Sequence, residues 1–417
     1  MKTQFYYRLL IPFLFFMLPF TGSAFGVLTH EAIIDALWDK ALVPLLKQKY
    51  PAATTEEIKT AHAYAYGGAV APDMGYYPRG SRLFTDLVHY VRSGDMVSAL
   101  LKEADNINQY AFALGFLSHY EADEYGHPLG TNRSVGLVYP KVGEKYGSQI
   151  TYEQDKIAHV RMEFGFDVLE VAKGNYASQS YHDFIGFKVD TTVLSKAFKE
   201  TYGLDINPVF GNHFSTAVET FRWVVANIFP VITKAAWAQK KAFIQKHDST
   251  ATAKSFGYRM HQKNYDRDFG KGYKRPGFGP TLLSFFIRVL PKVGPTKALK
   301  FKAPTPEAEK HFDQSFDTVL HYFNADIQKL HSGNIQLRDV DFDTGKPTDL
   351  CEYGLATRTY SKLLQKLYMG RFESITPALQ QNILDFYRGG QSLTDAGSEK
   401  CKKFFSELTE LGSAKIK

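Results

Sequence analysis

Three side chains of types that bind metal ions recur at four-residue intervals in one short segment. They are His119, Asp123 and His127. An α-helix turns about 400° in four residues, so the three side chains project from one stripe and drift only about 40° per step. The residues before them are mostly apolar, so we expect this helix to be buried and its polar stripe to be satisfied inside the protein. A bound metal ion would give these buried polar side chains the partners that they need.

A second pair with the same spacing, His159 and Glu163, lies in a segment that we expect to be helical. Taken alone, such a pair is more often a solvated pair on an exposed helix face than a metal site. Because a stronger motif precedes it in the same chain, we interpret the pair as further metal ligands.

Two upstream residues are additional candidate ligands. Asp73 stands in a loop framed by glycine and proline, where a lone Asp usually acts as a turn residue or helix cap. His89 lies in an apolar run, where a lone His is more often a hydrogen-bonded core residue. Tyr76 and Tyr77 follow Asp73 and are candidates for the wall of a substrate pocket, with ordinary packing as an equal alternative.

The first 24 residues are typical of a secretory signal peptide, with Lys2 and Arg8 before an apolar run and small residues up to Ala24. The apolar run has about a dozen residues, fewer than the roughly 20 that span a bilayer. Cleavage after Ala24 would give Phe25 a free α-amine shortly before His30. An α-amine has a pKa of about 8, so a metal ion can displace its proton. We expect a secreted or periplasmic protein.

Charge is distributed unevenly along the chain, whose formal net charge is +7. Residues 254–302 contain twelve Lys and Arg against two Asp, interleaved with aromatic residues. Such a segment suits contact with an anionic membrane or a nucleic-acid backbone, and a solvated Gly/Pro-rich loop is an equal alternative. Cys351 and Cys401 could pair in an oxidising compartment or act as apolar fillers in a reducing one.

Most periodic segments have the spacing of α-helices, and no convincing alternating strand is present. We therefore expect an all-α, multi-helix fold with irregular loops where glycine and proline accumulate. The helices predicted from apolar periodicity are Glu31–Leu46, Thr55–Tyr66, Val97–Leu101, Gln109–Tyr125, Glu153–Ala172, Phe214–His247, Glu307–His331 and Leu355–Met369. The predicted loops are Gly67–Ser81, His127–Gly147 and Gly257–Pro304.

Taken in order from Phe25 to about Leu169, these motifs resemble the zinc-dependent phospholipase C family, including the catalytic domain of glycosylphosphatidylinositol-specific phospholipase D. The single-strand-specific zinc nucleases have a related trinuclear site. We accordingly divide the chain into a signal peptide (1–24), a catalytic domain (25–250), a basic aromatic segment (251–305) and a helical C-terminal extension (306–417).

The resemblance implies a set of ligands for three zinc ions. Those of the first ion would be Asp73, His89, His119 and Asp123. Those of the second would be His127, His159 and Glu163. The third would be held by His30 and by the α-amine and carbonyl of Phe25, with Asp123 bridging it to the first. Asp73 would also orient or deprotonate the attacking water.

The activity that the resemblance implies is hydrolysis of phospholipid by a phospholipase C-like phosphodiesterase at a membrane surface. A zinc-dependent nuclease or nucleotidase is the alternative, and a non-catalytic metal-binding protein is a third possibility. No obligate protein partner is inferred. Choline-selective family members carry an acidic residue near the N-terminus, whereas Phe25–Thr29 contains none. This departure disfavours a preference for phosphatidylcholine.

Overall fold

The regular structure of the chain is helical throughout the part that can be described. The computed structural model describes residues 26–173, 186–227, 242, 245–246, 301–388 and 399–414. Within these ranges there is no strand, and the one isolated bridge pairs Val340 with Pro347. The all-α prediction is therefore confirmed. None of the described helices is both long enough and apolar enough to cross a membrane.

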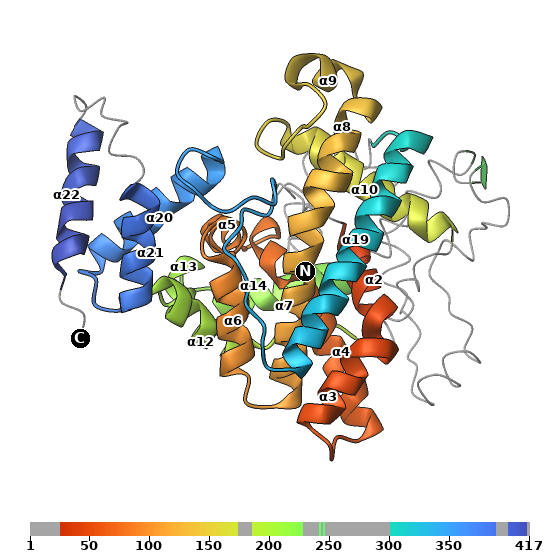
Figure 1. The fold of residues 1–417 in the computed structure, drawn as a ribbon, viewed down its shortest axis with the longest axis horizontal. Coiled ribbons are helices and arrows are strands. Elements are labelled where there is room, and N and C mark those ends of the chain that lie inside the picture. Colours follow the sequence, from red (N-terminus) through yellow and green to blue (C-terminus); the bar gives the residue numbers. More distant parts are fainter. Residues whose placement is uncertain are drawn as a thin grey trace, which may run out of the picture.

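A central helix, α7 (Ile107–Gly126), runs through the middle of the molecule, with the other helices of the first half around it (Figure 1). The elements before it are α2 (Val27–Leu37), η1 (Trp38–Leu42), α3 (Val43–Lys49), α4 (Thr55–Val70), η2 (Ala71–Tyr76), α5 (Arg82–Tyr90) and α6 (Ser93–Glu103). Those after it are η3 (His127–Thr131), α8 (Asn132–Val138), α9 (Pro140–Tyr146), α10 (Lys156–Lys173), α12 (Thr191–Tyr202), α13 (Ile206–Val209) and α14 (Phe214–Asn227).

Helix α7 lies unusually close to α4 because glycines on each helix face the backbone of the other. A Cβ atom on Gly68 of α4 would lie 1.9 Å from the carbonyl oxygen of Phe112. One on Gly115 of α7 would lie 2.0 Å from the carbonyl oxygen of Ala65. Any larger side chain at either position would force the helices apart. This contact fixes the depth at which the next turn of α7, with His119, lies in the core.

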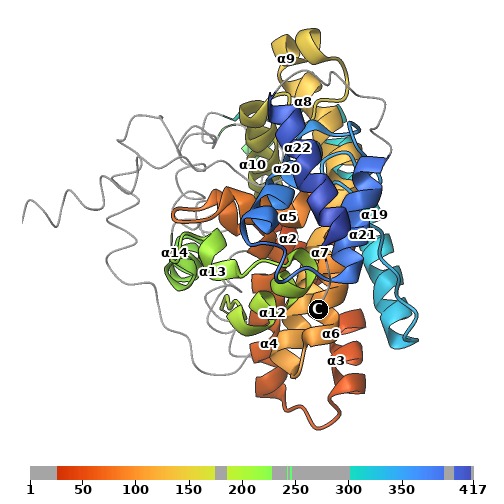
Figure 2. The ribbon, with the colours of Figure 1, turned by 90° about the vertical axis from the view of Figure 1, so that its left-hand side faces the viewer.

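The C-terminal helices pack onto the earlier ones. They are α19 (Pro306–His331), α20 (Gly354–Met369), α21 (Pro377–Arg388) and α22 (Glu399–Ser413). Helix α19 lies along α7, η3 and α8, and α20 packs against α5 (Figures 1 and 2). The ring of Phe312 on α19 stacks on that of Phe166 on α10, with 4.5 Å between centroids. The extension therefore shares the hydrophobic core of the first part of the chain.

The prediction of an irregular loop at His127–Gly147 is wrong, because this segment forms η3, α8 and α9. Pro140 begins α9, where a proline sacrifices no helical hydrogen bond, whereas Pro128 lies in the π-helical turn η3 that continues α7 directly. A Cβ on Gly130 would lie 2.5 Å from Oγ of Ser315, so the glycine allows α19 to pack here. Packing between helices thus overrides a glycine- and proline-rich composition that alone indicates a loop.

The other segments predicted from the sequence agree only in part with the helices and loops of the structure. The loop prediction for Gly67–Ser81 is wrong at its start, where α4 continues to Val70 and η2 follows. Helices α5, α12 and α13 were not predicted, whereas α21 and α22 confirm the predicted helical character of the C-terminal extension without having been predicted individually. The helix predicted at Phe214–His247 is confirmed as far as Asn227. The predicted signal peptide (1–24), Phe25 and residues 251–300 of the predicted basic segment lie outside the described residues.

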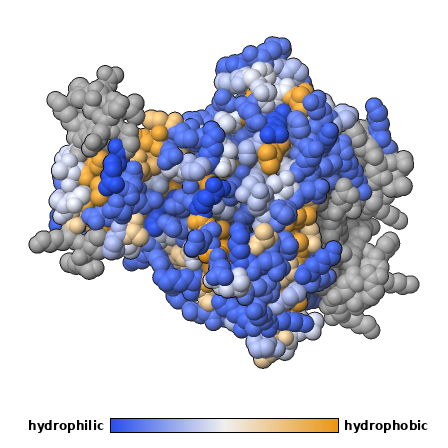
Figure 3. Space-filling model, in the orientation of Figure 1, coloured by the Kyte–Doolittle hydropathy of each residue, from blue (hydrophilic) through white to orange (hydrophobic). Residues whose placement is uncertain are grey.

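The face of the molecule seen in Figure 3 is covered mainly by hydrophilic residues. Apolar residues on this face form separate patches instead of one continuous area. Most of the large apolar side chains of the described helices are buried.

Candidate metal centre

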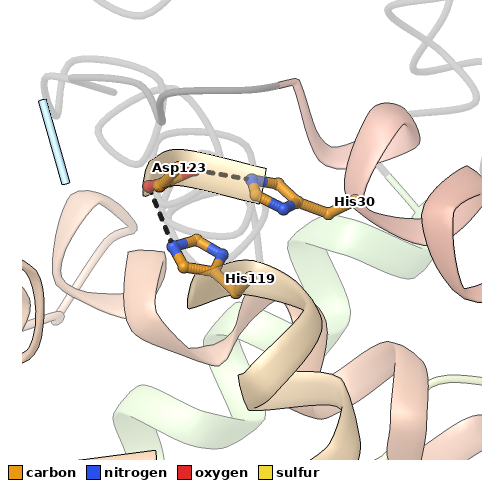
Figure 4. Close-up of side chains that lie close together, drawn as sticks. All are labelled: His30, His119 and Asp123. Carbon is orange, nitrogen blue, oxygen red and sulfur yellow. Dashed lines mark ion pairs between the residues drawn. The ribbon is translucent and has the colours of Figure 1, made fainter. Parts of the chain in front are cut away.

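Asp123 lies fully buried in a cluster of histidines that come from several helices. Its Oδ1 atom is 3.7 Å from Nε2 of His30 on α2. Its Oδ2 atom is 3.2 Å from Nε2 of His119, and 3.6 Å from Nε2 of both His89 and His127. Figure 4 shows the rings of His30 and His119 directed at this carboxylate from two different helices. A carboxylate surrounded in this way has both oxygens available to bridge two cations.

Three groups of possible ligands in the described part of the chain have donor atoms within 4.8 Å of one another, and every member is buried. The groups are His30, His119 and Asp123; Asp73, His89 and His119; and His127, His159 and Asp343. The first two share His119. Glu163 lies beside the third group, where its Oε1 is 2.6 Å from Nδ1 of His159. All predicted side-chain ligands are thus found in one region.

Hydrogen bonds to carbonyl groups fix two of these imidazole rings. Nδ1 of His119 donates to the carbonyl oxygen of Ala69 over 2.8 Å, and Nδ1 of His89 donates to that of Thr85 over 2.9 Å. A carbonyl oxygen can only accept, so Nδ1 carries the proton and the Nε2 lone pair faces the cluster. Histidines that bind metal are typically held in this manner.

Asp73 is held next to His89 by the turn that contains it. The hydroxyl of Thr85 donates to the carbonyl oxygen of Pro72 over 2.7 Å and accepts from the N–H of Gly75 over 2.8 Å. Oδ1 of Asp73 lies 3.3 Å from Nε2 of His89. Helix α5 therefore carries one candidate ligand and also fastens the loop that carries another.

The buried atoms that form no hydrogen bond provide a test of whether a metal fits. Among the described residues, these atoms include Nε2 of His127, Nδ1 of His159 and Oε1 of Glu163. A buried polar atom left without a partner costs about 1–3 kcal/mol. Zinc binds imidazole nitrogens and carboxylate oxygens, so a zinc ion would satisfy atoms of these types.

The electrostatics around Glu163 and His159 favour a bound cation. Burial, and then repulsion from Asp73 and Asp123, raise the pKa of Glu163 well above its ordinary value. Burial lowers the pKa of His159 to about 3, which keeps its imidazole neutral. Neutral imidazole is the form that binds metal, and a nearby cation would restore the charged form of a buried carboxylate. The donor set therefore fits zinc.

The two tyrosines predicted to line a substrate pocket are both buried, and they have different neighbours. The ring of Tyr76 lies 6.2 Å from that of His89, and the guanidinium of Arg82 lies over the Tyr76 ring at 4.4 Å from its centroid. The ring of Tyr77 packs edge-on against Phe221 of α14 at 4.8 Å. Tyr76 therefore borders the metal centre. Tyr77 packs against the apolar core, and burial followed by the nearby charge of Asp73 raises the pKa of its hydroxyl well above the ordinary value.

Two carboxylates at the centre were missed in the sequence. Asp167 accepts hydrogen bonds from the N–H groups of Leu28 and Thr29 at the start of α2, over 3.2 and 3.1 Å. It follows Glu163 by four residues, so the same spacing could have revealed it. Asp343 has no neighbouring ligand in the sequence, and only the packing of the C-terminal extension brings it to His127 and His159.

The comparisons with known proteins agree with this chemistry. Residues 29–212 match the family model described as zinc dependent phospholipase C. No curated protein and no solved structure matches the chain. The matched range contains every predicted side-chain ligand and ends well before Asp343. The chain therefore contains a zinc-dependent phospholipase C family domain in residues 29–212 and is a hydrolase of that family.

Proposed function

We propose that the protein is a secreted or periplasmic phospholipase C that hydrolyses the phosphodiester of membrane phospholipids with three zinc ions. The observation that carries the proposal is the position of Asp123, whose two oxygens face four histidines within a family domain that acts through zinc. The motif order and the predicted signal peptide support the extracytoplasmic location.

In this proposal the ligands divide as the sequence resemblance implies. The first ion would be held by Asp73, His89, His119 and Asp123. The second would be held by His127, His159 and Glu163. The third would be held by His30, Asp123 and the terminal amine and carbonyl of Phe25. Zinc held by these residues would supply Lewis acidity for phosphodiester hydrolysis, by activating water and neutralising the negative charge that develops.

Protein groups would contribute the remaining steps. Asp73 is our candidate to orient the attacking water and to accept its proton, because its carboxylate faces the same space as Nε2 of His89 at 3.3 Å. Tyr76, whose ring borders that of His89, would form part of the wall beside the phosphate. Tyr77 would support this wall from behind through its contact with Phe221.

The substrate would be a lipid at a membrane surface. The basic, aromatic segment 254–302 would hold the enzyme on anionic membranes by electrostatic attraction. The absence of an acidic residue in Phe25–Thr29 favours head groups other than choline.

The test is a side-by-side assay of zinc-loaded protein beginning at Phe25. Its substrates are vesicles of several phospholipids and single-stranded DNA, with diacylglycerol and nucleotide release measured separately. We expect lipid hydrolysis, with Asp73→Asn lowering kcat while most of the zinc remains bound. Asp105→Asn makes the same change at an exposed site and should leave the rate unchanged. Cleavage of DNA without lipid hydrolysis would instead establish the nuclease alternative.

A further inference from the structure

We propose that Asp343 is a positioning residue that fixes the rings and the proton positions of His127 and His159 for the second zinc ion. This inference rests on the proposed function, because it assumes a zinc ion at these two histidines. It concerns a residue of the C-terminal extension, beyond the range 29–212 that matches the family.

The carboxylate of Asp343 is buried, and both of its oxygens are occupied by protein groups. Oδ1 lies 3.1 Å from Nδ1 of His127 and 3.6 Å from Nε2 of His159. Oδ2 accepts hydrogen bonds from the N–H of Tyr152, over 2.8 Å, and from the hydroxyl of Tyr353. A carboxylate with these contacts is suited to accept a hydrogen bond from the protonated ring nitrogen of a histidine.

Asn132 determines which ring nitrogen of His159 carries the proton. Its Nδ2 donates to the carbonyl oxygen of Asp343 over 2.7 Å. A carbonyl oxygen can only accept, so the other end of the amide is the oxygen, which lies 2.8 Å from Nε2 of His159. Nε2 must therefore carry the proton, and the lone pair of His159 is on Nδ1.

Together these contacts specify which atoms face the metal. His127 is protonated on Nδ1 by its bond to Asp343, so its lone pair is on Nε2. Nε2 of His127 and Nδ1 of His159 are both buried and form no hydrogen bond among the described residues, and the same holds for Oε1 of Glu163. These three atoms belong to the three ligands that the sequence resemblance implies for the second zinc.

Asp343 could instead bind zinc directly, because one of its oxygens lies within 4.8 Å of a nitrogen on each histidine. Those nitrogens are Nδ1 of His127 and Nε2 of His159, which already bond to Asp343 and Asn132. Direct binding would break both hydrogen bonds, and the opposite nitrogens would then face only the carboxylates of Asp123, at 3.6 Å from Nε2 of His127, and Glu163, at 2.6 Å from Nδ1 of His159. The geometry therefore favours the positioning role.

The loop that carries Asp343 is fastened to the centre at several points. The N–H of Phe342 donates to the carbonyl oxygen of His89 over 3.1 Å. The ring of Phe342 packs against the rings of His89 and His119, at 5.3 and 5.9 Å. A Cβ on Gly345 would lie 2.3 Å from the carbonyl oxygen of Glu124, so the loop touches the backbone of α7. Contacts that involve no metal thus hold Asp343 beside the two histidines.

The test measures zinc binding in the full chain beginning at Phe25. Stoichiometry and affinity are determined by competition with a chromogenic chelator, and the visible spectrum is recorded after substitution with cobalt. For Asp343→Ala we expect all three ions to bind at saturating zinc, one of them about 10–100-fold more weakly, with an altered cobalt spectrum. Asp341→Ala is the matched control, since it makes the same substitution at another buried carboxylate of the same loop, one that bonds to Thr344.

Tyr353→Phe removes one hydrogen bond from Oδ2 of Asp343 and should weaken the same ion by a smaller factor. This variant keeps the inference testable if Asp343→Ala fails to fold, which the melting temperature of the metal-free protein would reveal. Unchanged affinity in the folded variants would overturn the positioning role. Loss of one ion at saturating zinc would also overturn it, in favour of direct binding. Fewer than three ions in the unsubstituted protein would instead count against the proposed function.

Discussion

Gly26 faces the carboxylate of Asp167 so closely that a Cβ atom on the glycine would lie 1.8 Å from Oδ2. Asp167 also accepts hydrogen bonds from the N–H groups of Leu28 and Thr29 and from the hydroxyl of Thr29. A carboxylate at the N-terminus of a helix satisfies free N–H groups and interacts favourably with the helix dipole. Helix α10 thereby holds the end of α2 that presents His30 to the centre.

Gly26→Ala should move the start of α2 and weaken the metal site at His30. The backbone angles of Gly26, φ −62° and ψ 155°, suit alanine, so only the contact with Asp167 opposes the change. We expect a loss of about 1–3 kcal/mol in the free energy of unfolding and weaker binding of one zinc ion. Gly370→Ala is the control, because the atom nearest to its Cβ would be 3.5 Å away. Equal stability and zinc affinity in both variants would contradict this account.

A residue retained before Phe25 should remove or weaken one zinc ion. Only a processed N-terminus offers an amine and a carbonyl to the same ion, since the lone pair of an amide nitrogen is delocalised into the peptide bond. Protein beginning at Phe25 and protein with one additional residue should be compared for zinc content and phosphodiesterase rate. We expect partial loss of metal and activity without unfolding. Identical zinc content and rate would exclude the terminus as a ligand.

Asp123→Asn should be the most damaging single substitution at the centre. An amide cannot replace a carboxylate that serves two ions, so we expect loss of at least two zinc ions and of activity. Metal analysis of protein purified without chelator measures this. Asp35→Asn is the control, because Asp35 also faces a histidine, His62, at 3.0 Å but belongs to none of the three groups of possible ligands. Retention of all zinc in Asp123→Asn would remove Asp123 from the bridging role.

Gly115→Ala should separate α7 from α4. The new Cβ would lie 2.0 Å from the carbonyl oxygen of Ala65, so the helices must shift, at a cost of about 1–3 kcal/mol. The shift should also weaken the bond from His119 to Ala69 and reduce zinc affinity. In Gly412→Ala the nearest atom is 3.9 Å away, and this helical control should be neutral or slightly stabilised. Denaturant unfolding of the two variants measures this difference in the free energy of unfolding.

Vesicle binding should increase with anionic lipid and decrease with salt, because surface charges are screened by ions. The basic residues Lys271, Lys274 and Arg275 belong to the segment 254–302, mostly outside the described residues. Replacing these three by glutamine should weaken binding to anionic vesicles and leave hydrolysis of a soluble phosphodiester unchanged. Unaltered vesicle binding would end the membrane hypothesis for this segment.

The sequence predicts those ligands of the centre whose spacing within one segment indicates a shared helix face. His119, Asp123 and His127 share a helix stripe because of their spacing, and the structure brings them together as predicted. The role of Asp343 has no such signal, since it depends on the packing of α19 and α20 against earlier helices. The helical path of His127–Gly147 was missed for a similar reason, because close packing against α19 compensates for its glycines and prolines.

The centre combines residues that lie far apart in the chain, from His30 on α2 to Asp343 beyond α19. Contacts between residues so far apart in sequence form late and slowly in folding, because a long loop must close first. A chain still emerging from the ribosome would have the histidines of α7 without the partner that orients His127. Tight zinc binding would then require the completed fold. Zinc would therefore bind at the last stage of folding and would not direct the first.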